Sequence, residues 1–209
     1  MHRLSPALTL LAATVAACSP TPSVPPSGLP TLPLPTATSG SQSVAPSSTS
    51  AAFTFADGEH RVREDIEPGT YRAIPPDLSG DGFCYWERVS GFGGTDAETI
   101  ANSAGVGPRV VTIGTGDAGF NSDDCGTWTS DVSAIPGPYG DGVWIVGTDL
   151  EPGRYSSEGG AACVWQRLSG FGGTADESLT VGLTGTVEIL ATDRGFSSSN
   201  CGIWTREGD

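Results

Sequence analysis

The residues of this sequence that are best suited to chemistry are acids and arginines that recur at fixed positions. Arg88 and Arg167 each follow a tryptophan by two residues, and Asp117 and Asp193 each stand two residues before a Gly-Phe pair. An arginine can pair with a carboxylate, stack on a tryptophan or, when left unpaired, bind an anion. We predict structural ion pairs between Arg88 and Asp117 and between Arg167 and Asp193.

The composition excludes most catalytic machinery. The 209-residue chain has 10 basic residues, all of them arginine, against 24 acidic ones, and its net charge is −14. Without lysine it has no Schiff-base or P-loop residue, and its acidity disfavours nucleic-acid binding. Only one histidine, His60, lies beyond the extreme N-terminus, so triads and histidine-rich zinc sites lack their usual residues. We therefore expect no enzyme activity, no metal, no cofactor and no nucleic-acid partner.

Two alternatives for the acids remain open. Asp77 with Asp81, and Asp117 with Asp123 and Asp124, form clusters that could bind Ca²⁺, although neither follows EF-hand spacing. Neither cluster recurs in the second half of the chain. Paired carboxylates could instead catalyse glycoside hydrolysis, which is a remote alternative.

The N-terminus has the features of a bacterial lipoprotein leader. After Arg3 comes a ten-residue run of mostly apolar residues (8–17), too short to span a bilayer, which needs about 20. This run ends in Val-Ala-Ala-Cys, which resembles a lipobox. We predict a signal peptide over 1–17, lipidation of Cys18 with acyl chains such as palmitate, and anchoring to the extracytoplasmic face of the cell membrane. An ordinary secretory signal with an incidental cysteine is the alternative.

A tether separates this anchor from the rest of the chain. Residues 19–52 have no charged side chain and are rich in Pro, Ser and Thr. Such a segment cannot bury enough apolar area to offset the entropy cost of ordering. We predict a disordered tether over 18–52 that holds the folded part away from the membrane.

The remainder contains one pattern twice, which determines the expected domains. The segment Asp65–Tyr71 matches Asp149–Tyr155, and Cys84–Thr95 matches Cys163–Thr174. The match gives three segments: β repeat 1 over 53–131, a linker over 132–140 and β repeat 2 over 141–209.

Each repeat is too small to be stable on core burial alone, and secreted domains of this size are commonly held by disulfides. The symmetry of the copies predicts the bonds Cys84–Cys125 and Cys163–Cys201, which leave Cys18 for the lipid. Two metal half-sites are the alternative use of these four cysteines.

The strand signals predict an all-β fold, with each repeat a small β-sandwich or barrel, standing alone or packed as a pseudo-twofold pair. Short runs rich in Val, Ile, Thr, Tyr and Trp alternate with Gly, Pro and Asp clusters. In repeat 1 the expected strands lie near 60–66, 70–74, 83–89, 98–103, 109–115, 118–122 and 126–129. The glycine-rich segments 91–94 and 170–173 should be loops.

Four tryptophans recur between the copies, at 86 and 165 and at 128 and 204. We expect them to pack over the disulfides, and the fifth, Trp144, to face inward. An exposed aromatic platform for sugars is the alternative.

The combined pattern resembles a repeat found in secreted proteins and lipoproteins of actinobacteria. It is carried by Asp65–Tyr71, Cys84–Arg88 and Cys125–Trp128, and again in the second copy. The resemblance implies an envelope-exposed β module of unknown function. We predict a non-enzymatic cell-envelope lipoprotein that displays two β modules to an unknown envelope protein. A carbohydrate or wall-glycan binding module is the alternative, and a carboxylate-based hydrolase is a remote one.

Overall fold

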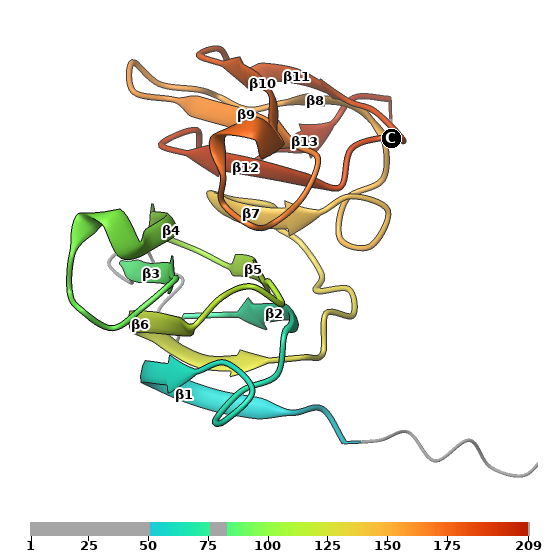
Figure 1. The fold of residues 1–209 in the computed structure, drawn as a ribbon. Helices are drawn as coiled ribbons and strands as arrows, with labels where there is room; N and C mark the ends of the chain where they lie inside the picture. The colour runs from blue at the N-terminus through green and yellow to red at the C-terminus, as the bar shows by residue number, and fades with distance from the viewer. Residues whose placement is uncertain (1–50, 76–82, 209) are drawn as a thin grey trace, which may run out of the picture. The chain divides into compact units, whose positions relative to one another are not determined.

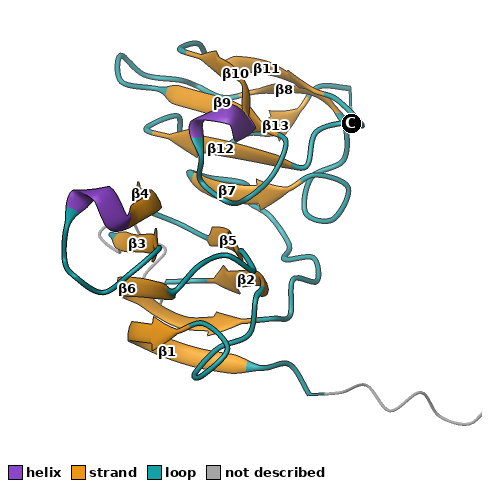
Figure 2. Cartoon of the chain, viewed as in Figure 1, coloured by secondary structure: helices purple, strands orange, loops and turns teal. Residues whose placement is uncertain are grey.

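The computed structural model describes residues 51–75 and 83–208, which form an almost all-β protein with curled sheets (Figure 1). The predicted signal peptide, Cys18, most of the predicted tether, and Asp77 and Asp81 lie outside the described residues. Within the described part, the helical segments are two 3₁₀ turns, Asp96–Glu98 and Ala175–Glu177 (Figure 2). No helix of this part is long and apolar enough to cross a membrane.

Repeat 1 is built on one six-stranded sheet. Its strands are β1 (Thr54–Arg61), β2 (Gly69–Ala73), β3 (Cys84–Val89), β4 (Thr99–Gly105), β5 (Arg109–Ile113) and β6 (Gly119–Thr129). The order is β4-β3-β6-β2-β5, and β1 also pairs with β6. The long strand β6 pairs with β3 through its first half and with β2 through Trp128 and Thr129, so the sheet curls around it.

Repeat 2 divides the same pattern between two sheets. Its strands are β7 (Gly142–Ile145), β8 (Gly153–Ser156), β9 (Val164–Leu168), β10 (Ser178–Gly182), β11 (Thr186–Ile189), β12 (Gly195–Ser199) and β13 (Thr205–Arg206). One sheet has the order β10-β9-β12-β7 and the other β11-β8-β13. Both repeats belong to one compact unit of the chain.

Two strand predictions need correction. The first strand was expected near 60–66, but β1 spans Thr54–Arg61 and the chain then turns. The Asp65 carboxylate accepts a hydrogen bond from the Arg61 amide, and Arg63 has a positive φ of 72°, which ends the strand. The strands expected at 118–122 and 126–129 are one strand, β6, whose pairing with β1 shifts register between Ser122 and Thr127, where Asp124 and Gly126 have positive φ.

The cores of the two repeats are alike. Phe120 and Trp128 meet edge to face with their ring centroids 5.1 Å apart, and Phe196 and Trp204 repeat this contact at the same distance. The disulfides Cys84–Cys125 and Cys163–Cys201 lie in the same two cores, each with a Cα–Cα distance of 4.4 Å. The prediction of an all-β fold with two disulfide-bonded repeats is confirmed.

Candidate functional site

The two predicted ion pairs are present and hold equivalent loops. Arg88 donates to Asp117 through Nε at 2.7 Å and Nη2 at 2.8 Å, and Arg167 donates to Asp193 at 2.6 and 2.8 Å. Each carboxylate also accepts a backbone amide three residues earlier in the chain, that of Gly114 or Leu190. Every oxygen of the two carboxylates thus has a structural partner, which fits a role in the fold.

The protonation of these groups agrees with that role. Burial would raise the pKa of Asp193, but hydrogen bonds from Arg167 and the Leu190 amide lower it below its usual range. The hydrogen bond from Arg88 to Asp117 raises the pKa of Arg88, although burial acts to lower it. A carboxylate held ionised beside an arginine is a poor general acid, because it has no proton to give near neutral pH.

The described residues contain no group of three or more His, Cys, Asp or Glu side chains close enough to hold a metal ion. Asp117, which the sequence analysis placed in a possible Ca²⁺ cluster with Asp123 and Asp124, is instead bonded to Arg88. Asp77 and Asp81, the other candidate cluster, lie outside the described residues.

All five tryptophans are buried, with at most 8% of any side chain exposed. Trp128 donates its indole N–H to Ser122, and Trp165 donates to the Thr184 carbonyl. Trp144 packs on Tyr139 and donates to the Gly140 carbonyl, so it faces inward as expected. Core packing therefore accounts for the repeated tryptophans, and they do not form the exposed platform that a sugar ring would need.

The repeats are joined by a buried ion pair that the sequence analysis missed. Arg72 on β2 donates to Asp149 of repeat 2 at 3.0 and 2.8 Å, and the two side chains are 1% and 0% exposed. Asp149 also accepts the amides of Ile135 and Ile145. The position equivalent to Arg72 in repeat 2 is Ser156, so no repeated motif marks this arginine.

A second set of inter-repeat contacts surrounds the glycine-rich loop of repeat 2 (Gly170–Gly173). Arg88 Nη1 donates to the Gly172 carbonyl at 2.7 Å, and the Thr112 amide donates to the Phe171 carbonyl at 2.8 Å. A side chain at Gly173 would collide with the Trp86 ring, so this ring lies directly on the loop. Arg88 therefore serves both its own repeat and the junction.

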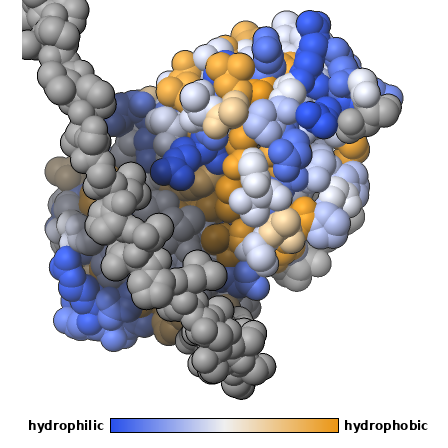
Figure 3. All heavy atoms as spheres, turned by 90° about the vertical axis from the view of Figure 1, so that its right-hand side faces the viewer, coloured by the Kyte–Doolittle hydropathy of each residue, from blue (hydrophilic) through white to orange (hydrophobic). Residues whose placement is uncertain are grey.

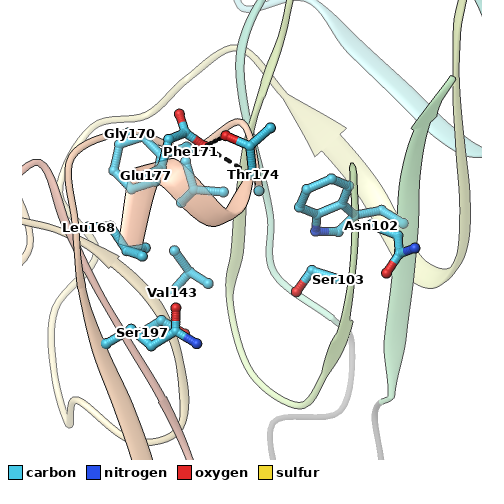
Figure 4. Close-up of a pocket in the computed structure, with 13 residues that line it drawn as sticks. Asn102, Ser103, Val143, Leu168, Gly170, Phe171, Thr174, Glu177 and Ser197 are labelled. Carbon is cyan, nitrogen blue, oxygen red and sulfur yellow. Dashed lines mark hydrogen bonds between the residues drawn. The ribbon is translucent and has the colours of Figure 1, made fainter. Parts of the chain in front are cut away.

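A hollow of about 190 Å³ remains where the repeats meet (Figure 4). Asn102 and Ser103 of β4 lie on its repeat 1 side, and Val143, Phe171 and Ser197 are among the residues on its repeat 2 side. The Thr174–Glu177 hydrogen bond closes the adjoining turn. Repeat 1 thus packs against one sheet face and the glycine-rich loop of repeat 2.

The signal that could have revealed this junction is the difference between the copies. In β5 three consecutive residues from Arg109 to Val111 are buried, whereas β11 alternates buried and exposed residues. Val110 and Thr112 occupy the positions of the exposed Thr186 and Glu188. An apolar residue on the outer face of only one copy indicates that this copy is covered there.

Hydrophobic residues also reach the surface, and Figure 3 shows several groups of them (orange) on the face that it presents. A cavity of about 560 Å³ has Val106, Pro136, Trp144 and Ile203 among its walls. Asp141 is the charged residue among its described walls, and its carboxylate already accepts the Cys201 amide. The cavity walls are therefore mostly apolar, with few of the polar groups that orient a ligand.

Strand β10 presents a different surface. Leu179 and Val181 on this strand and Leu183 directly after it are 47%, 56% and 71% exposed. Among the described strands, β10 is an edge strand whose one neighbour is β9. The equivalent positions of repeat 1 hold Ile100, Asn102 and Ala104, so the apolar stripe belongs to repeat 2 alone.

These features define a class, a disulfide-bonded β-repeat module whose two copies are joined by buried contacts. The model of the Rv1352-like extracellular domain family matches residues 38–129 and 135–205 of this sequence. The match covers most of the chain, so the chain belongs to that family, and its location is extracytoplasmic. No curated protein and no solved structure matches the chain.

Proposed function

We propose that the protein is a lipid-anchored, non-enzymatic module that binds another protein of the cell envelope through the exposed edge strand β10. The family to which the chain belongs is one of extracellular domains, and the leader ends in a lipobox-like sequence at Cys18. The four repeated Arg and Asp residues form structural pairs, which supports a non-enzymatic role. Burial of the tryptophans removes the main support for the glycan-binding alternative.

The observation that carries this proposal is the apolar stripe on β10. An edge strand has unpaired backbone groups, and proteins usually protect such edges with charges, prolines or bulges. Ser178–Gly182 has no charge and no proline, and its irregularity is a register shift between Ser178 and Thr180. The side chains of Leu179 and Val181 on the strand and of Leu183 just beyond it are exposed. A partner strand that adds to this edge would satisfy the backbone groups and cover the side chains.

Photo-crosslinking in the envelope tests this proposal. A photoreactive amino acid at Val181 of the full lipidated chain should give an adduct of discrete mass with the partner. Introducing Leu179→Lys and Leu183→Lys into the same chain should remove that adduct, because the lysines break up the apolar stripe. The matched control carries the photoreactive group at Ile100, on the equivalent strand of repeat 1, where no such adduct is expected. An adduct that survives both lysines, or one of equal yield from Ile100, would refute binding through β10.

The anchor is tested separately. Cys18→Ser should move the protein from the membrane fraction to the soluble fraction and abolish incorporation of labelled palmitate, because no other residue would carry the acyl chains. Ser19→Ala, one residue further on, should leave both measurements unchanged. Retention of the Cys18→Ser protein in carbonate-washed membranes would contradict the lipid anchor.

A further inference from the structure

Each repeat forms the same hollow from equivalent residues, but only the hollow of repeat 2 is covered by the other repeat. In repeat 2, Phe171, Thr174 and Glu177 border the hollow that receives repeat 1. In repeat 1, the equivalent residues Phe92, Thr95 and Glu98 border a hollow of about 210 Å³. No described segment of the chain covers this second hollow as repeat 1 covers the first.

The loop beside the open hollow is built in the same way as the loop that binds repeat 1. Glu98 accepts the Thr95 and Gly93 amides, which lower its pKa, just as Glu177 accepts the equivalent amides in repeat 2. Gly94 and Gly173 have φ values of 71° and 77°. The loop of repeat 1 therefore needs no rearrangement to act as an acceptor.

The carbonyls of the glycine-rich loop that bind repeat 1 have unused counterparts on the loop beside the open hollow. Arg88 and Thr112 donate to the carbonyls of Gly172 and Phe171. Among the described residues, no hydrogen bond uses the equivalent carbonyls of Gly93 and Phe92. The Phe92 ring is exposed, with the Arg61 guanidinium 4.4 Å from its centroid.

The floor of the open hollow differs from its counterpart in charge. Glu59 replaces Val143, Glu87 replaces Gln166, and Asp96 at the rim replaces Ala175. Glu87 is held in place by Asn121, whose amide donates to it at 2.8 Å, and by the Tyr85 hydroxyl. Together with Glu98, four carboxylates face the hollow, and Arg61 is the cation that lies beside them.

A second copy of the chain is a poor occupant. If repeat 2 of another molecule docked as repeat 1 does, Glu188 would replace Thr112 and face this acidic floor. Ser156 would replace Arg72, so the buried ion pair of the junction would also be missing. Like charges and a lost ion pair both oppose head-to-tail assembly.

We propose that the open hollow of repeat 1 binds an arginine-bearing segment of a partner protein. The arginine donates to the Phe92 and Gly93 carbonyls as Arg88 does to Gly172, and further basic side chains meet the carboxylates of Glu59 and Glu87. This inference rests on the proposed binding function but uses a surface distinct from β10, so each can fail alone.

The test uses two capped peptides and the full chain carrying Cys18→Ser. The peptides are Trp-Gly-Arg-Arg and the reference Trp-Gly-Glu-Glu, and binding is followed by amide chemical shifts. The arginine peptide should shift the Phe92 and Gly93 resonances in a saturable way, and the reference should not. The variant Glu59→Val, Glu87→Gln, Asp96→Ala, which takes the residues of repeat 2, should weaken binding about tenfold or more.

The matched control removes the same number of charges elsewhere, with Glu64→Gln, Glu67→Gln and Glu158→Gln, and should keep the affinity of the parent chain. Equal weakening in both triple variants would reduce the effect to net charge and overturn the proposal. So would equal binding of both peptides, or self-association in sedimentation that the hollow variant abolishes. Leu179→Lys should leave peptide binding unchanged, which separates this result from the test of β10.

Discussion

Asp149→Asn is expected to lower the free energy of unfolding by about 3–5 kcal/mol, which is the typical cost of removing one partner of a buried ion pair. The Arg72 guanidinium would remain buried without a counter-charge, because its side chain is 1% exposed. Chemical denaturation of the full chain measures the effect. Because this pair joins the repeats, limited proteolysis of the connection over 132–140 should also become faster.

Asp65→Asn is the matched control for this prediction. Asp65 occupies the same position in repeat 1 and accepts a hydrogen bond from the equivalent backbone amide, that of Arg61, but it is exposed and forms no ion pair with an arginine of the described residues. It should therefore cost only about 1 kcal/mol. If the two variants destabilise the protein equally, the ion pair does not hold the junction.

The double variant Arg72→Met, Asp149→Asn separates the pair from its burial. Replacing a buried pair by less polar residues is often close to neutral, so the double variant should recover much of the stability that Asp149→Asn loses. Ile135 and Ile145 still need an acceptor for their amides, which the asparagine oxygen can supply in part. Recovery of stability would show that the large loss caused by Asp149→Asn comes from leaving Arg72 buried without its counter-charge.

The features that the sequence predicted well are those that the repeat displays twice. Cysteine symmetry gave the disulfides, and the paired positions of Arg88 with Asp117 and Arg167 with Asp193 gave the ion pairs. Each depends on contacts within one repeat, so the second copy acts as an independent check on the first.

The junction was not predicted because it depends on residues that do not repeat. Arg72 has serine as its counterpart in repeat 2. The hydrogen bond from Arg88 to the Gly172 carbonyl uses a backbone oxygen, which every residue type has, so the sequence does not reveal it. The position of β1 was missed for a similar reason. Its end is set by a side chain-to-backbone bond at Asp65, while alternation alone continues into the turn.

Removing the disulfide of repeat 1 by Cys84→Ala with Cys125→Ala should lower the free energy of unfolding by about 4 kcal/mol, from the chain entropy of a loop with a sequence separation of 41. The control pair, Cys163→Ala with Cys201→Ala, opens a loop with a separation of 38 and should cost nearly the same in chain entropy. Denaturation of both variants under oxidising conditions measures the two losses.

The two variants should differ in what happens at the junction. Trp86 and Arg88, which contact the glycine-rich loop of repeat 2, lie on the strand that begins at Cys84. Loosening that strand weakens both repeat 1 and the junction, so proteolysis over 132–140 should accelerate more in the Cys84 variant than in the Cys163 variant. Equal acceleration of proteolysis in the two variants would mean that the junction does not depend on the order of β3. If either variant lowered the free energy of unfolding by less than about 1 kcal/mol, the disulfide would not stabilise its repeat as proposed.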